Sequence, residues 1–105
     1  MSKLIWIEAE DPDAVPRLAE TLESNGLRAD VTRTIRGEPE VRIQKPRLQR
    51  MKPFMVRVES VVRRWLVEQA PDLRGVIVQT VDERFEIRSP SAYALGPRTR
   101  PAAPA

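Results

Sequence analysis

The sequence of 105 residues predicts a single α+β domain, an antiparallel sheet covered on one face by two helices. Three observations support this fold class. Apolar residues recur at helical spacing in two stretches of the chain, they alternate with polar residues in others, and the two patterns follow one another along the chain. A chain of this length forms one hydrophobic core.

The first strand and the first helix are predicted between residues 4 and 25. Residues 4–9, LIWIEA, carry apolar side chains on both faces, which favours a central position in the sheet. Asp13 is the expected N-cap, because Pro16 then falls at the third helical position, where the helix does not need an N–H group. Asn25-Gly26 ends the helix. Its apolar face consists of Val15, Leu18 and Leu22.

A β-hairpin is predicted over residues 28–45. Apolar and polar residues alternate on both sides of a turn at residues 36–39. Arg33 interrupts the inward-facing series of the first arm, so it lies near a sheet edge or the register shifts there. The expected inward-facing residues are Ala29, Val31, Ile35, Val41 and Ile43.

The second helix is the strongest pattern in the sequence. Pro53 suits the first turn of a helix, and Pro71 requires the helix to end at Gln69 and Ala70. Seven apolar residues fall on a single arc of roughly 140° at helical spacing, as in a helix that faces a core. They are Phe54, Met55, Val58, Val61, Val62, Trp65 and Leu66, and we expect Arg57, Arg63 and Arg64 to stay in solvent.

The C-terminal part of the chain adds a fourth strand, VIVQTV, and an optional fifth, RFEIR, after a turn at Asp82 and Glu83. From Ser89 onward the chain is rich in proline and alanine. We therefore divide it into a domain of residues 1–88 and a tail of residues 89–105 that is expected to be flexible. The order strand, helix, strand, strand, helix, strand predicts the split βαβ or ferredoxin-like arrangement.

The composition restricts the chemistry of the protein. The chain has no cysteine and no histidine, which excludes disulfides, thiolate nucleophiles and imidazole bases. Glu8, Glu10, Asp11 and Asp13 offer oxygen ligands for a magnesium ion, but a helix cap and a solvated loop explain them more simply. We expect a protein without catalytic residues, metal or cofactor. No signal segment or membrane span is recognisable, so we expect a soluble, cytoplasmic protein.

Charge is distributed unevenly along the chain. Residues 1–40 carry five basic and nine acidic residues, a net charge of −4, whereas residues 41–70 carry eight and two, a net charge of +6. This pattern suits a polyanion, or the contact of an acidic part of one copy with a basic part of another. The candidate polyanion-binding residues are Arg42, Lys45, Arg47, Arg50, Lys52, Arg57 and Arg64.

A simpler explanation of the helical charges is a solvated surface, because Glu59 and Arg63, and Arg64 and Glu68, have the spacing of ordinary ion pairs. Sheet proteins that bind single-stranded RNA stack bases on aromatic residues of the central strands. The third strand, EVRIQK, has none. Nothing beyond the order of elements resembles the RNA-recognition motif, so any nucleic-acid binding is expected to be weak and non-specific.

Leu4 and Trp6 raise a separate question. If Ile5, Ile7 and Ala9 face the helices, these two side chains lie on the opposite face of the sheet, beside Arg42 and Gln44. A second copy of the protein or the tail, through Tyr93 and Leu95, are candidates to cover them. A partly exposed tryptophan shielded by arginine stems needs no such partner.

Together these patterns predict a small non-enzymatic domain that binds another protein or itself as a homodimer, with Leu4 and Trp6 as candidate partner-binding residues. The alternative is a nucleic-acid accessory protein that contacts the phosphate backbone through residues 42–64. No membrane partner is expected.

Overall fold

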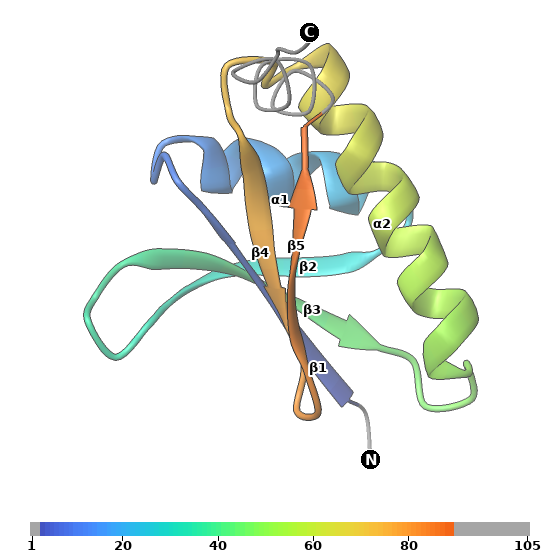
Figure 1. The fold of residues 1–105 in the computed structure, drawn as a ribbon. Coiled ribbons are helices and arrows are strands. Elements are labelled where there is room, and N and C mark those ends of the chain that lie inside the picture. The colour runs from blue at the N-terminus through green and yellow to red at the C-terminus, as the bar shows by residue number, and fades with distance from the viewer. Residues whose placement is uncertain (1–2, 90–105) are drawn as a thin grey trace, which may run out of the picture.

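The computed structural model describes residues 3–89. The described part of the chain forms two helices and five strands (Figure 1). In chain order they are β1 (Lys3–Ala9), α1 (Ala14–Ser24), β2 (Arg28–Arg33), β3 (Pro39–Lys45), α2 (Met51–Glu68), β4 (Gly75–Gln79) and β5 (Arg84–Arg88). The α+β class and the optional fifth strand are both confirmed.

The five strands form one sheet in the order β2-β3-β1-β4-β5, and every neighbouring pair is antiparallel. The first four strands follow the ferredoxin-like arrangement, in which each strand–helix–strand unit encloses an antiparallel strand between its two parallel ones. β5 departs from that arrangement because it extends the sheet beside β4. The predicted central position of β1 is confirmed, and β2 and β5 form the two edges.

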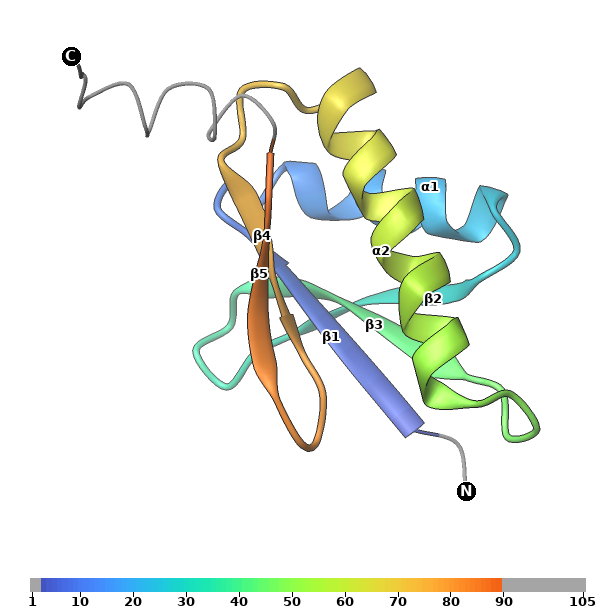
Figure 2. The same ribbon diagram turned by 45° about the vertical axis from the view of Figure 1, so that its right-hand side comes forward.

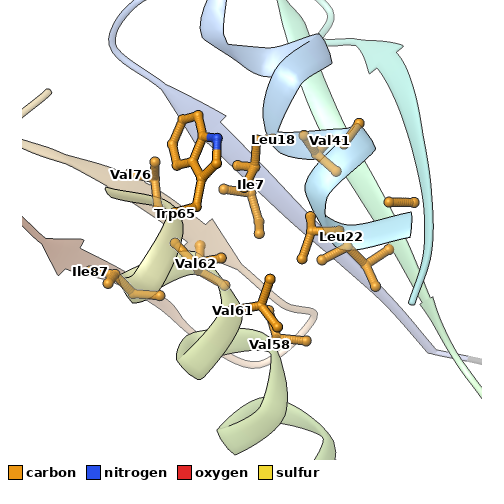
Figure 3. Packing of buried hydrophobic residues seen from close by; sticks show 14 of the residues in the cluster. Ile7, Leu18, Leu22, Val41, Val58, Val61, Val62, Trp65, Val76 and Ile87 are labelled. Carbon is orange, nitrogen blue, oxygen red and sulfur yellow. The ribbon is translucent and has the colours of Figure 1, made fainter. Parts of the chain in front are cut away.

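Both helices lie on the same face of the sheet (Figures 1 and 2). Every strand sends alternate side chains toward them, and these side chains form one buried core with the apolar faces of α1 and α2. Figure 3 shows the indole ring of Trp65, which is 1% exposed, packed between the sheet and α1 near Ile7 and Leu18. The indole Nε1 is buried and has no hydrogen-bond partner among the described residues.

Asp13 is the N-cap residue of α1, as predicted, but its side chain makes no capping hydrogen bond. Its backbone is already helical, with φ of −69° and ψ of −19°. The two N–H groups that a capping side chain would accept are also not available. Pro16 has none, and the N–H of Val15 donates to the carbonyl of Pro12. Asp11 supplies the hydrogen-bond acceptors at the start of the helix. Its Oδ1 accepts the Asp13 N–H at 3.0 Å, and its carbonyl accepts the Ala14 N–H.

The opposite end of α1 agrees with the prediction. Gly26 has a φ of +83°, a conformation that glycine adopts without strain. The N–H groups of Gly26 and Leu27 donate to the carbonyls of Glu23 and Leu22, which satisfies the last turn of the helix as in a Schellman motif.

The apolar arc of α2 is confirmed in full. All seven predicted core residues of this helix are buried, and Arg57, Arg63 and Arg64 are exposed. The helix also ends as expected, because the N–H groups of Gln69 and Ala70 both donate to the carbonyl of Trp65 just before Pro71.

The hairpin prediction was correct for the two strands but wrong for the turn. The turn begins at Thr34, whose N–H donates to the carbonyl of Glu38 at 2.8 Å, and Gly37 supplies the positive φ of +86°. Ile35 therefore lies in the turn, fully exposed, instead of facing the core. Val31 does face the helices, but it is 46% exposed because β2 is an edge strand. The same edge position explains the exposed Arg33.

Candidate interaction surface on the open face of the sheet

The face of the sheet that the helices leave uncovered is here called the open face. Cross-strand pairing defines one row of side chains through its centre. Trp6 pairs with Arg42 on one side and with Gln79 on the other, and the row continues to the edge strands through Asp30 and Arg84. The sequence-based placement of Trp6 opposite the helices is therefore confirmed, together with its proximity to Arg42.

The apolar side chains of the open face are few and only half-buried. Leu4 pairs with Gln44, and Ile77 pairs with Glu8, so each apolar side chain has a polar neighbour across the strand. Leu4, Trp6 and Ile77 are all intermediate in exposure. An open face of this kind is neither a second core nor an ordinary charged surface.

Charged neighbours on this face neutralise one another in part. Arg42 pairs with Asp30 at 3.4 Å, and Arg88 pairs with Glu86 at 3.0 Å. The guanidinium group of Arg84 donates to Oε1 of Gln79 at 3.4 Å. These contacts are solvent-exposed, so they stabilise the fold by little, but they order the side chains around Trp6.

Trp6 lies in an open depression of about 610 Å³. Glu8, Glu40 and Gln79 line it from the sheet, and side chains of the β2–β3 turn, including the fully exposed Ile35, line it from the side. In Figure 1 this turn projects away from the helices. The depression therefore has half-buried residues at its floor and exposed, mostly charged residues at its rim.

Two carboxylates lie together at the floor of this depression. Glu8 follows Ile7 and Glu40 precedes Val41, and because Ile7 pairs with Val41 across the antiparallel strands β1 and β3, the two glutamates lie side by side. Burial raises the pKa of Glu40 above its ordinary value of 4.5, repulsion from Glu8 raises it further, and a hydrogen bond from Thr32 opposes both effects. The ionised form of Glu40 is therefore less favourable at this corner of the open face than in solvent.

The structure separates the seven candidate polyanion-binding residues into groups. Arg42 lies on the open face, opposite α2. Lys45 is buried on the helix side of β3, where its Nζ donates to the carbonyls of Pro46 and Gln49. Lys45 follows Val41 and Ile43 at alternate positions of the strand, so the sequence pattern already places it on the inward face. Counting the basic residues of this segment did not take that alternation into account.

The remaining five candidates are exposed on or next to α2. Arg57 donates to the backbone carbonyl of Asn25 and so joins α2 to the end of α1. Arg64 lies beside the same helix end, in a small depression with Thr21 and Glu68. Arg47, Arg50 and Lys52 are grouped around the start of α2 without an ion pair in the described part of the chain. The candidates thus do not form one continuous surface.

The acidic residues after β1 do not converge on a metal site. Within residues 3–89 no group of three or more Asp and Glu side chains is arranged to hold a metal ion. Asp11 instead serves the start of α1, as described above. None of the helices in this range is long and apolar enough to cross a membrane.

Sequence reasoning missed the contribution of the β2–β3 turn and of Glu40 to the surface around Trp6. Glu40 is detectable in principle, because it stands one residue before the inward-facing Val41 and so belongs to the same face as Trp6. Its proximity to Glu8 required the strand order, which places β3 next to β1. The candidates Tyr93 and Leu95 and the tail from residue 90 onward lie outside the described residues.

Comparison of the chain with protein-family models, with curated proteins and with solved structures finds no match, so the candidate site is interpreted from its own geometry.

Proposed function

We propose that this protein is a small interaction domain that binds a polypeptide on the open face of its sheet, with Trp6 and Leu4 at the centre of the contact. The observation that carries the proposal is the half-buried Trp6 in an open depression, on the sheet face that neither helix of residues 3–89 covers. Tryptophan is enriched at the centres of protein interfaces because it buries a large area with few rotatable bonds. The bound polypeptide is another protein or a second copy of this chain.

The surrounding charges support a polypeptide over a small apolar ligand. Acidic and basic side chains alternate around Trp6, and most of them are exposed. A rim of this kind contributes specificity and association rate more than affinity. The depression is also open to solvent, whereas small-molecule sites enclose most of the ligand surface.

The test compares Trp6→Ala with Leu48→Ala. Leu48 is 99% exposed in the loop before α2 and lies outside the depression, so it is a matched control for the loss of an exposed apolar side chain. Each full-length variant is immobilised and exposed to a lysate of the cells that produce the protein, and each is also examined by sedimentation equilibrium. Polypeptide retention or self-association that Leu48→Ala preserves and Trp6→Ala abolishes is the expected result. Identical behaviour of both variants would contradict the proposal.

The alternative function, contact with a nucleic-acid backbone, is supported by Arg47, Arg50 and Lys52. If these three residues all reach phosphates on duplex DNA, the affinity falls about 40-fold between 50 and 200 mM salt, because three contacts correspond to a slope of roughly −2.7. We therefore expect weak retention on DNA that disappears near physiological salt. Binding that persists there and prefers one sequence would favour this alternative over the interaction domain.

A further inference from the structure

The open face contains two carboxylates that lack an ion-pair partner. In residues 3–89 the ion pairs are Arg42 with Asp30, Arg63 with Glu59, and Arg88 with Glu86. Glu8 and Glu40 take part in none of them, although both line the depression that holds Trp6. Burial and repulsion from Glu8 make the ionised form of Glu40 less favourable than in solvent and raise its pKa. A cation bound between the two carboxylates would relieve this repulsion.

The arginines that line the same depression do not supply that cation. Arg33 donates to the carbonyl of Gly37 at 2.7 Å, within its own turn. Arg84 donates to Gln79 on the other side of Trp6. Arg36 is exposed in the turn and forms no ion pair with the two glutamates.

The aromatic ring beside the carboxylates favours one type of cation. A guanidinium group stacks on an aromatic face and also donates to carboxylates in its own plane. Trp6 offers such a ring next to Glu8 in the same strand and near Glu40 in the neighbouring strand. The floor of the depression therefore fits an arginine side chain better than a phosphate or another anion.

The chain itself carries arginines of this kind. Residues 90–105 include Arg98 and Arg100 and no acidic residue. Arg88 lies in β5, two strands from β1. Glu86, two residues before it, is level with Glu8 across the sheet, so Arg88 lies about 12 Å from Glu8 at ordinary strand spacings. Arg98 is the ninth residue after Ser89, a stretch that spans at most about 30 Å when fully extended. Both arginines are thus within reach of Glu8 and Glu40.

We propose that the segment following Ser89 docks on the open face of its own chain, where Arg98 or Arg100 packs on Trp6 and pairs with Glu8 and Glu40. The proposal rests on the proposed function, because it gives the same face a ligand that is always present. A segment tethered at this distance acts at an effective concentration in the millimolar range, so even a weak contact is populated. A polypeptide partner must displace the segment to reach Trp6.

The test is the indole N–H signal of Trp6 in ¹H–¹⁵N NMR spectra of the full-length chain. The buried Trp65 gives the second indole signal, and Trp6→Phe assigns the two. Arg98→Ala/Arg100→Ala should shift the Trp6 signal and leave the Trp65 signal in place, whereas the control Thr99→Ala should shift neither. In a Glu8→Gln/Glu40→Gln background the two arginine substitutions should have no further effect.

Salt and protein concentration identify the occupant. Raising the salt from about 0.1 M to 1 M shortens the screening length from about 10 Å to about 3 Å and should reproduce the shift of the arginine variant. A shift that depends on protein concentration would overturn docking within one chain in favour of a second copy. An unchanged Trp6 signal in Arg98→Ala/Arg100→Ala would overturn it altogether. That failure is distinguishable from failure of the proposed function, which the retention assay with Trp6→Ala measures separately.

Discussion

The two faces of the sheet are built from the same five strands but differ in almost every physical property. The face toward the helices carries Ile5, Ile7 and their neighbours in a core from which water is excluded. The open face alternates charged side chains with three half-buried apolar ones. Because successive side chains of a strand point to opposite faces of the sheet, one set of residues holds the domain together and the other set is available for a partner. Substitutions on the two faces should accordingly have different consequences.

The largest effect is expected for a charge placed in the helix-covered core. Val58→Asp should abolish folding, because Val58 is fully buried and an unpaired carboxylate there costs several kcal/mol, comparable to the whole stability of a domain of this size. Circular dichroism and NMR dispersion measure the outcome. Arg63→Ala, on the solvent side of the same helix, is the control and should change stability by at most about 0.5 kcal/mol. A cooperative transition of Val58→Asp at the wild-type midpoint would refute the core assignment.

The two tryptophans provide a direct comparison of the faces. Trp65→Ala should lower the free energy of unfolding by about 3–5 kcal/mol, because it leaves a large cavity in the core. Trp6→Ala should lower it by only about 1 kcal/mol, because its ring is only partly buried and water can fill the space that it leaves. Urea denaturation of both variants checks the difference. Equal losses would mean that the open face belongs to the core of the domain.

Gly75 tests how tightly the edge strand β5 is held. A Cβ added at Gly75 would collide with the backbone carbonyl oxygen of Ile87 and lie 3.1 Å from the Cα of Arg88. Gly75→Ala should therefore destabilise the protein by about 1–3 kcal/mol, since backbone atoms must move apart. Gly37→Asn is the control, because nothing lies near the added Cβ and asparagine tolerates the positive φ, so we expect a loss of about 0.5 kcal/mol or less. A neutral Gly75→Ala variant would contradict the close approach of β4 and β5.

The smallest effect is expected for Glu40→Gln on the open face. Because the folded state raises the pKa of Glu40, folding is favoured when this carboxyl is protonated, and stability is lost as pH rises above 4.5. In the Arg98→Ala/Arg100→Ala background, where no docked arginine offsets the repulsion from Glu8, the neutral glutamine should raise the free energy of unfolding at neutral pH by at most about 0.5 kcal/mol. The gain should vanish well below pH 4.5, where the glutamate is protonated in both states. Glu8 is the repelling carboxylate, and Arg33, Arg36, Glu38 and Arg84 are the other charged residues of the depression.

Denaturation midpoints at the two pH values measure this effect. Glu20→Gln, on the exposed side of α1, is the control and should not show the same pH dependence. A gain of stability for Glu40→Gln that grows on acidification would have the wrong sign for a raised pKa.

The fold was predictable because its local signals agree with one another. The apolar arc of α2 extends over more than three turns, from Phe54 to Leu66, so no other period accounts for it, and all seven of its residues are buried. The Asn25-Gly26 stop was also clear from residue type, whereas β5 was predicted only as an optional strand and the structure shows it paired with β4. The prediction for Ile35 was wrong because it depended on one hydrogen-bonded turn, where a shift of one residue changes the direction of a side chain.

The candidate site was predictable only in part. The alternation of β1 places Trp6 opposite the helices, and this much is a property of the sequence alone, because successive side chains of a strand point to opposite faces. The strand order, which no local pattern contains, decided that Glu40 lies beside Glu8. The alternation within β3, by contrast, already places Lys45 and Arg42 on different faces. The sequence by itself thus determined the elements, the core and the uncovered tryptophan. Only the tertiary structure decided which charges share a surface, because charge–charge proximity arises from chain segments that fold together across long separations in sequence.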